Sequence, residues 1–466
     1  MSTAPLLLCS AMAIALLYAG SRAVPTHDLY IFLAMGEWMA DHRTLMTEEI
    51  YTWTAQGTEF ANATWAFSIC SWLLFDTIGL DGLRIFNGVL LTLAVGLMAR
   101  ASLSAGADPR AAAMAALYTW AMTLQNTVIR GQTWVFVGMS LLAWITAKPR
   151  PNRFLVPAGL LIGLVWSNFH GSFPAGIVFL GALAVGGAWE HKNLNSGRTP
   201  LLLAAAMAVG VSLGPNGIEI WSYALENSRL SKARLFVEWM PAPLWSVKSA
   251  RLYGAFVLWA VLLYRERLRT PPAHLLLLLG FGVLATTGSR FIAWFGLATA
   301  LPFAMRLSRT MAPEHGIPTR LGKPVTLLLA SLWCIFLVRG LTPGEQTLSE
   351  DTPIELVDAI RSSARSGRVL NPPEYGGYIT QRLYPDFQTS GDIRTWIYDD
   401  ATWNIYLSFT QPSDDWEERL DALGVTHLLL TVDHHQEWFI PAVNNSKAWR
   451  LLAETDFGAA YMRTER

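Results

Sequence analysis

Charged residues are scarce in this chain of 466 amino acids. Asp, Glu, Lys and Arg together make up 15% of the sequence, whereas 52% of the residues are hydrophobic. Soluble globular proteins carry about 25% charged residues. Because so few charges cannot cover the surface of a chain of this length, much of that surface must face lipid. The composition excludes an ordinary soluble protein.

The sequence also lacks clusters of positive charge and of cysteine. Its 35 Lys and Arg residues balance its 35 Asp and Glu residues, and no long basic run is present. Binding to nucleic acid is therefore excluded, since it depends on basic side chains that neutralise phosphates. The three cysteines lie in separate apolar stretches, without metal-ligand spacing or the pattern of a disulfide framework. We expect them to pack in the apolar core.

Long hydrophobic runs, in contrast, are abundant. A helix that crosses a membrane needs about 20 mostly apolar residues, and the sequence predicts about 11 transmembrane helices. No basic residue precedes the first run, which favours an uncleaved span over a signal peptide. The predicted spans are 5–20, 84–99, 111–128, 131–147, 154–168, 172–189, 199–214, 252–264, 273–288, 290–305 and 324–339.

The apolar stretch 65–80, which contains Asp76, decides the orientation of every later span. If it lies along the membrane interface, five short loops that together hold 14 Lys and Arg residues share one side. The short connections on the other side then keep only Arg130 and Arg290. Because short loops rich in Lys and Arg stay in the cytoplasm, this arrangement is favoured, and both arginines are predicted to lie outside.

Two domains are predicted from the change in composition along the chain. Residues 1–339 form a transmembrane domain, in which 21–83 is a first extracytoplasmic loop with interfacial helices. Residues 340–466 are richer in Asp, Glu and Arg and predict a small extracytoplasmic α/β domain. Within it we expect helices at 372–383 and 417–423, and strands at 426–432, 449–452 and 459–462.

Polar and ionisable side chains gather at the predicted outer ends of the spans. Such groups are costly at membrane depth and usually face a cavity or a partner. This pattern favours an outward-facing cavity for an anionic lipid headgroup. The candidate residues are Asp28, Glu48, Glu49, Arg130, Gln132, His170, Asn216, Glu238 and Arg290. The simpler interpretation is that the carboxylates are solvated, the arginines anchor to the interface, and the histidine and asparagine only form local hydrogen bonds.

The motifs around these residues resemble, in their order, bacterial membrane proteins related to the GT-C glycosyltransferases. This class contains lipid-linked aminoarabinose transferases and protein O-mannosyltransferases. Each motif is short, but together they cover most of the chain. The matching stretches are Asp28 to Trp38, Glu48 to Gly57, Phe60 to Trp65, Arg130 to Gln132, Asn168 to Gly171, Pro215 to Gly217, Glu238-Trp239, Arg290-Phe291, Asn371 to Tyr378, Gly391 to Thr395 and Leu423 to Leu428.

The resemblance implies a GT-C-like bundle in the bacterial inner membrane. It would transfer a sugar from a polyprenyl-phosphate donor to a glycan, lipid or protein acceptor on the outer face. By position, Asp28 would be the base that activates the acceptor and Glu49 a second acid. Arg130 and Arg290 would hold the lipid phosphate, with His170 as a further contact. GT-C enzymes differ in their use of a divalent metal; no ligand spacing here demands one, so no metal residues are predicted.

The sequence departs from the family pattern at Ala63 and Thr64, where the group has a His-Glu pair. This departure favours an alternative, a non-catalytic scaffold of an envelope polysaccharide pathway. Polar residues spread over several outer loops disfavour it. A polymerase or ligase of such a pathway is a second alternative. A transporter is disfavoured, because the sequence shows neither polar residues near mid-span nor broken helices in repeated halves.

The orientation predicts which introduced cysteines a membrane-impermeant thiol reagent can reach. Ser196→Cys lies in a predicted cytoplasmic loop and should react only after the membrane is permeabilised. Ser231→Cys lies in the outer segment 216–251 and should react in intact cells. Labelling of the two positions in a cysteine-free chain measures this, and the reverse pattern would invert the whole topology.

Overall fold

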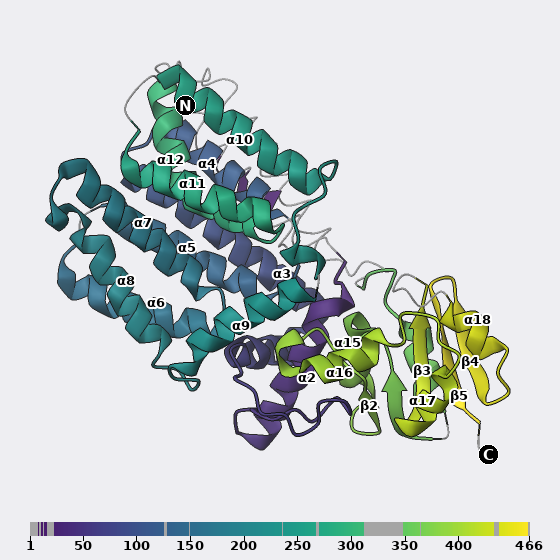
Figure 1. The fold of residues 1–466 in the computed structure, drawn as a ribbon. Helices are drawn as coiled ribbons and strands as arrows, with labels where there is room; N and C mark the ends of the chain where they lie inside the picture. The colour runs from purple at the N-terminus through teal and green to yellow at the C-terminus, as the bar shows by residue number, and fades with distance from the viewer. Residues whose placement is uncertain are drawn as a thin grey trace. The chain divides into compact units, whose positions relative to one another are not determined.

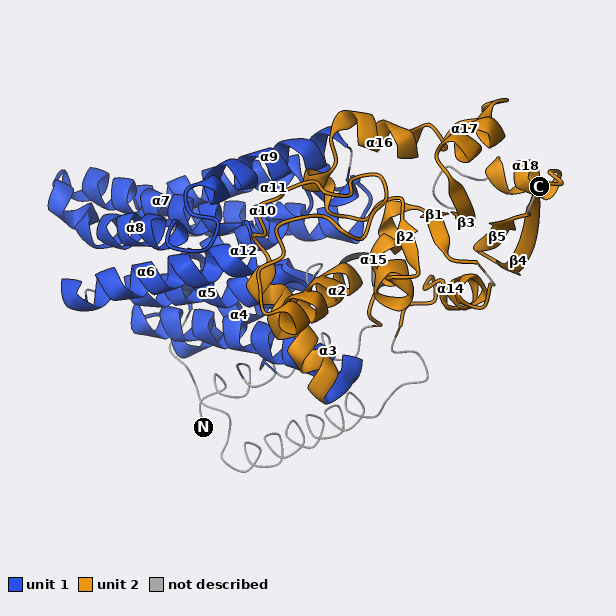
Figure 2. Cartoon of the chain, turned by 90° about the horizontal axis from the view of Figure 1, so that it is seen from below, with its two compact units in different colours: residues 1–22, 78–344 blue, residues 23–77, 345–466 orange. Residues whose placement is uncertain are grey.

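The chain folds into two compact units, and each unit is built from two separate segments (Figure 2). Unit 1 contains Met1–Arg22 and Ile78–Gly344, and unit 2 contains Ala23–Thr77 and Glu345–Arg466. This grouping differs from the predicted division at 339, because the first outer loop belongs with the C-terminal segment. The computed structural model describes Leu8, Ala11–Met12, Ile14–Ala15 and residues 23–464, except 125–127, 149, 235, 267–269, 312–347, 364 and 433–437.

Unit 1 is a bundle of apolar helices (Figure 1). Every predicted span from 84–99 to 290–305 coincides with one of them, whereas 324–339 and most of 5–20 lie outside the described residues. The elements are the second part of α3 (Trp65–Ser104), α4 (Pro109–Thr123), α5 (Gly131–Thr146), α6 (Asn152–Phe169), α7 (Phe173–His191), η2 (Leu194–Gly197), α8 (Arg198–Val211), α9 (Glu219–Ala233), η3 (Val237–Trp239), α10 (Val247–Glu266), α11 (Pro272–Thr287) and α12 (Phe291–Thr310).

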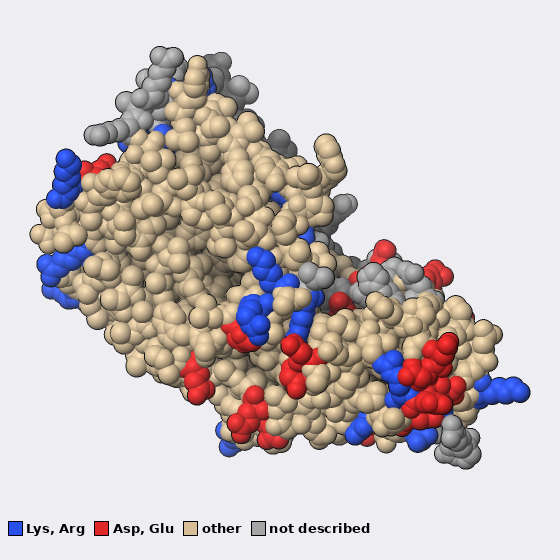
Figure 3. Space-filling model, in the orientation of Figure 1, with Lys and Arg blue, Asp and Glu red and all other residues tan. Residues whose placement is uncertain are grey.

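Length and composition allow four helices of the described part to cross a membrane. They are Trp65–Ser104, Phe173–His191, Val247–Arg265 and Phe291–Thr310. Large aliphatic side chains lie exposed on the bundle, and in Figure 3 its surface is largely free of Lys, Arg, Asp and Glu. Such a surface is stable against lipid tails rather than water. The protein is a multi-pass membrane protein, and the total of 11 spans stays a prediction.

Helix α3 is broken at Gly79, where φ is 69° and ψ is −177°. Glycine adopts this backbone conformation without the steric cost that a side chain would bring. The break separates the stretch 65–80 from the predicted span 84–99, and the boundary between the two units falls beside it. The interfacial position of 65–80 stays a prediction.

Unit 2 contains a five-stranded mixed sheet with strand order β2-β1-β3-β5-β4. Strand β1 is parallel to β2 and β3, whereas β5 is antiparallel to β3 and β4. The strands are β1 (Gly367–Leu370), β2 (Phe387–Thr389), β3 (Val425–Thr431), β4 (Trp449–Thr455) and β5 (Gly458–Arg463); the C-terminal helices are α14 (Ile354–Arg361), α15 (Pro373–Leu383), η4 (Thr395–Ile397), α16 (Asp400–Leu407), α17 (Trp416–Ala422) and α18 (Phe439–Asn444). The five expected elements coincide with α15, α17, β3, β4 and β5.

Residues 51–53, in the predicted first outer loop, extend the sheet at the outer edge of β2. Thr52 and Thr389 form a parallel bridge. The N–H of Trp53 donates to the carbonyl of Thr389 over 3.0 Å, and the N–H of Thr389 donates to the carbonyl of Tyr51 over 3.1 Å. Main-chain pairing across more than 300 residues therefore makes 23–77 part of unit 2.

Helix α2 (Thr26–His42) packs against α15 and against the first part of α3. The rings of Tyr30 and Tyr378 meet edge to face, with centroids 5.0 Å apart. A methyl group on Gly377 of α15 would lie 2.8 Å from the main-chain nitrogen of Ile31, and one on Gly36 of α2 would lie 2.2 Å from the carbonyl oxygen of Ser68. Both contacts require glycine.

The burial of Ser231 changes the choice of position for cysteine labelling on the predicted outer side. Ser231 is buried on α9, whereas Ser222 on the same helix is exposed. Ser222→Cys is therefore the better outer position, and the exposed Ser196 serves for the cytoplasmic side.

The close approach at Gly377 predicts that Gly377→Ala destabilises unit 2 by about 1–3 kcal/mol. Alanine favours a helix more than glycine does, but its methyl group would push against the backbone of α2. Gly391→Ala is the control, because the nearest atom to its new methyl group is 3.7 Å away. Thermal unfolding in detergent measures both variants, and a more stable Gly377→Ala would contradict this account of the packing.

Candidate functional site

The predicted site residues lie in both units. Unit 1 holds Arg130, Gln132, His170, Asn216, Glu238 and Arg290, and unit 2 holds Asp28, Glu48 and Glu49.

The unit 1 cluster is organised around the short helix η3. The guanidinium group of Arg130, which precedes α5, forms an ion pair with Glu238. The guanidinium group of Arg290, which precedes α12, lies over the ring of Trp239, 4.2 Å from its centroid. The N–H of Arg290 also donates to the carbonyl of Glu238 over 3.0 Å. One three-residue segment thus contacts both predicted phosphate-binding arginines.

The charges around Glu238 keep this carboxyl group ionised. Burial opposes its ionisation, but the positive charges of Arg130 and Arg290 outweigh burial and lower the pKa of Glu238 to about 2. The side chain is still 37% exposed, so solvent reaches the ion pair and screens it. Both arginines precede helix N-termini, where unpaired N–H groups and the helix dipole also favour an anion.

His170 lies in the turn between α6 and α7, outside both predicted spans. Its Nδ1 accepts a hydrogen bond of 3.1 Å from the N–H of Ser172, so the neutral ring carries its proton on Nε2. Burial, with the nearby charges of Arg290 and Arg130, lowers the pKa of His170 to about 3. The side chain is therefore a neutral donor beside two cations.

Gln132 and Asn216 lie at or near the N-terminal ends of two helices. Gln132 is buried in the first turn of α5. Asn216 lies in the turn before α9, where its carbonyl accepts a hydrogen bond of 3.1 Å from the N–H of Glu219. The next residue, Gly217, has a φ of 53°, as a tight turn requires. The turn accounts for Asn216 without a substrate.

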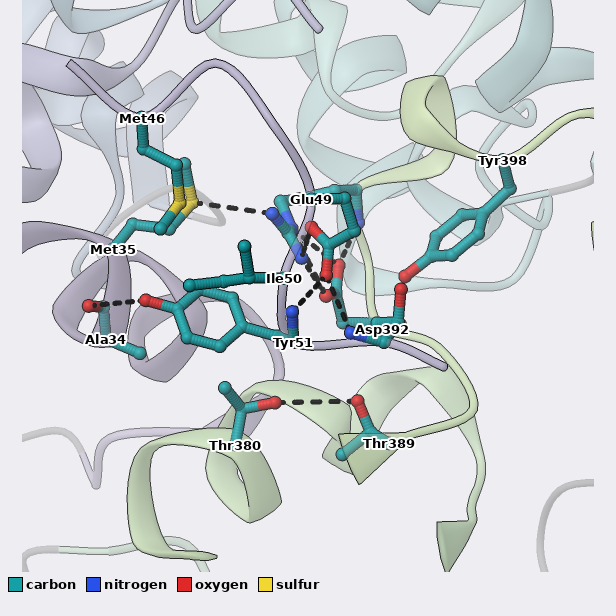
Figure 4. Close-up of polar contacts among 12 residues, drawn as sticks. Ala34, Met35, Met46, Glu49, Ile50, Tyr51, Thr380, Thr389, Asp392 and Tyr398 are labelled. Carbon is teal, nitrogen blue, oxygen red and sulfur yellow. Dashed lines mark hydrogen bonds and ion pairs between the residues drawn. The ribbon is translucent and has the colours of Figure 1, made fainter. Parts of the chain in front are cut away.

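In unit 2, Glu49 belongs to a completely buried group of charges with Asp392 and Arg394, which joins the segment 23–77 to the C-terminal segment (Figure 4). Arg394 donates to both carboxylate oxygens of Asp392 over 2.6–3.1 Å, and its Nη2 lies 2.7 Å from Oε2 of Glu49. The N–H groups of Tyr51 and Thr52 donate to Oε1 of Glu49 over 2.8 and 2.7 Å. All three charged side chains are 0% exposed.

These surroundings speak against Glu49 as a second acid in catalysis. Burial raises its pKa, although Arg394 opposes this shift. Both of its carboxylate oxygens contact protein groups, and the side chain is not exposed to solvent. Glu48 is exposed and pairs with Glu59 through the main chain. Asp28 lies in the first turn of α2, and its side chain is outside the described part of the structure.

Two residues of the buried cluster, Asp392 and Arg394, were not predicted as site residues. The motif Gly391 to Thr395 marks their region, but no sequence pattern pairs Arg394 with Glu49. Ala63 and Thr64, which replace the family's His-Glu pair, are both buried. They leave no ionisable side chain at that place. Among the described residues, no three His, Cys, Asp or Glu side chains are arranged to hold a metal ion.

Comparison with known proteins identifies the fold. No protein-family model and no curated protein matches the sequence. The structure is similar to ArnT from Cupriavidus metallidurans bound to undecaprenyl phosphate, with a TM-score of 0.57, 12% identity and coverage of 99% of this chain and 98% of ArnT. Arabinofuranosyltransferase AftD from Mycobacteria has a TM-score of 0.53 and 14% identity. This chain is covered completely but spans 40% of AftD. The fold is that of the GT-C-type glycosyltransferases.

The GT-C resemblance indicated by the motifs is thus confirmed for the fold. In ArnT without ligand the agreement is similar, with a TM-score of 0.58, 13% identity and coverage of 98% of this chain and 97% of ArnT. At such identities a GT-C fold does not by itself assign roles to residues. The roles rest on the local geometry described above.

The depressed pKa of His170 predicts a loss of stability in acid. The unfolded chain binds a proton on this residue below pH 6.5, but the folded GT-C bundle does not until about pH 3. Stability should therefore fall between these values, by up to about 2 kcal/mol at pH 5. His170→Asn removes this loss, since the Asn oxygen can still accept from the Ser172 N–H.

Thermal unfolding in detergent at pH 7 and pH 5 measures the effect. The wild type should lose more stability than His170→Asn, while the exposed His191→Asn control should behave as the wild type does. Equal pH dependence in all three proteins would show that His170 is not held in its neutral form.

Proposed function

We propose that the protein transfers a sugar from a polyprenyl-phosphate donor to a glycan, lipid or protein acceptor in the cell envelope. The observation that carries the proposal is the GT-C fold, which matches ArnT with undecaprenyl phosphate over nearly the whole of both chains. The cluster of Arg130, Arg290 and His170 supports it, because two cations and a neutral N–H donor suit a lipid phosphate.

The proposed reaction is a displacement at C1 of the sugar. Asp28 accepts the proton of the acceptor hydroxyl group, and the acceptor oxygen forms a bond to C1. The bond between C1 and the phosphate oxygen breaks, and polyprenyl phosphate leaves with the electron pair. Arg290 and Arg130 stabilise the negative charge on this leaving group. Glu49 is given no part in these steps.

The ion pair of Glu238 with Arg130 affects donor binding. The carboxylate of Glu238 binds the guanidinium group of Arg130 as a phosphate oxygen would, and because Glu238 is partly exposed, a ligand can displace it. A donor phosphate therefore competes with Glu238 for Arg130.

We place the reaction on the outer face of the bacterial inner membrane. The distribution of Lys and Arg supports this orientation, with unit 2 outside. A non-catalytic scaffold of a polysaccharide pathway is the second candidate. The buried Ala63 and Thr64, which cannot replace a His-Glu pair chemically, favour it.

Mass spectrometry of lipid-linked sugars and envelope glycans tests the proposal. The strains are the wild type, a deletion, and the deletion complemented with Asp28→Asn or with Arg290→Gln. The deletion and Asp28→Asn should lose one glycan modification and accumulate one lipid-linked sugar. Arg290→Gln should reduce the modification by about 10²–10³-fold, since a donor to the leaving oxyanion is removed.

Arg229→Gln is the control, because this exposed arginine lies in the predicted outer segment 216–251 and forms an ion pair with Glu226 on the same helix. It should complement the deletion fully. Equal amounts of each protein in the membrane are required. A deletion that changes a glycan while Asp28→Asn complements it would remove the catalytic role of Asp28 and favour the scaffold.

A further inference from the structure

Arg394 contacts three separate parts of unit 2 with one guanidinium group. It binds Asp392 in its own segment and Glu49 in the first outer loop. Its Nη1 also lies 3.7 Å from the sulfur of Met35 in α2. Because these contacts are buried, water cannot replace any of them.

The loop held by this charge cluster is the one that extends the sheet. Beside the main-chain pairing of Thr52 with Thr389, the hydroxyl of Thr54 donates to the carbonyl of Ser390 over 2.6 Å. The side chain of Gln388 donates to the carbonyl of Ile50 over 3.3 Å. Glu49 immediately precedes this ladder, so its ion pair with Arg394 fixes the ladder's beginning.

The same loop also fixes helix α2. The hydroxyl of Tyr51 donates to the carbonyl of Ala34 over 2.9 Å, as Figure 4 shows. Ala34 and Met35 lie two turns after Asp28 on α2. The helix that carries the proposed base is thus tied to the loop by a hydrogen bond and to Arg394 by a direct contact.

We propose that Arg394 is a positioning residue, which locks the first outer loop to the C-terminal sheet and thereby holds α2 and Asp28 in place for the transfer reaction. The proposal rests on the proposed function, because that function makes Asp28 the base. Arginine is required at this position because its planar guanidinium group can donate to two carboxylates at once. The single ammonium group of lysine does not reproduce this geometry.

The chain offers a matched control in Arg463. This arginine also bridges two carboxylates within unit 2, Glu417 and Asp421, each at 2.6 Å, but it lies between β5 and α17. Neither Arg463 nor its two partners belongs to the loop or to α2. Arg463→Lys therefore weakens a similar bridge without touching the proposed lock.

Hydrogen exchange in the full-length protein measures the lock without a substrate. In Arg394→Lys, the amides of Trp53 and Thr389 should exchange at least about tenfold faster than in the wild type, because the ladder opens locally. Arg463→Lys should leave both amides unchanged. Glu49→Gln is the second, milder variant, since it keeps an acceptor for the Tyr51 and Thr52 N–H groups. If neither Arg394→Lys nor Glu49→Gln accelerates these amides, the lock does not exist.

Glycan analysis in the deletion strain then measures the positioning. Arg394→Lys should lower the modification about tenfold or more, and Arg463→Lys should not. A disulfide between Thr52→Cys and Thr389→Cys, in a chain free of other cysteines, should restore it by closing the ladder covalently. If the amides of Arg394→Lys exchange faster but the glycan modification stays complete, Arg394 has no positioning role. If the deletion itself changes no glycan, the proposed function fails, while the exchange data still decide whether Arg394 locks the loop.

Discussion

The structure of unit 2 depends on one buried guanidinium group between two buried carboxylates. Removing such charges from water costs several kcal/mol for each ion, and only complete pairing offsets this cost. Arg394 meets the condition by a two-oxygen contact with Asp392 and an ion pair with Glu49, which two main-chain N–H groups also bind. Loss of one partner of a buried pair costs about 3–5 kcal/mol, a large part of the stability of a typical domain. Together with the main-chain pairing of Thr52 and Thr389, the cluster therefore holds the two chain segments of this unit together.

The ion pair of Arg130 with Glu238 has the same chemical groups in different surroundings. Its carboxylate is 37% exposed, whereas Glu49 is 0% exposed. Solvent reaches this pair and weakens it, so its partners can be exchanged more easily than those of a buried pair. A ligand anion can compete for Arg130, but it cannot reach Arg394. Burial, rather than residue type, separates the proposed binding cluster of unit 1 from the buried cluster of unit 2.

The difference in burial also explains which features could be predicted from the sequence. The long apolar helices and the buried strand β3 follow from periodicity and length. Strands β1 and β2 have four and three residues, too few to show a period. The position of Glu49 in a motif that resembles a family pattern predicted a catalytic acid, and such a resemblance carries no information about burial. Its partner lies 345 residues away, and no local pattern connects the two. The arginine cluster of unit 1 was predicted because the positive-inside rule leaves few cations outside.

The chain order also constrains how the protein assembles. Residues 23–77 precede residues 78–344 of the bundle, whereas their partners in unit 2 follow them. The segment 23–77 therefore cannot pair with β2 until the bundle and β2 itself have been synthesised. Until then Glu49 lacks Arg394, and its charge is stable only in water. Contacts between such distant residues form late, because chain entropy must be lost before they add stability. The helix that carries Asp28 thus obtains its final support only after the chain has been synthesised through Arg394, which couples the proposed active site to the folding of residues on both sides of the bundle.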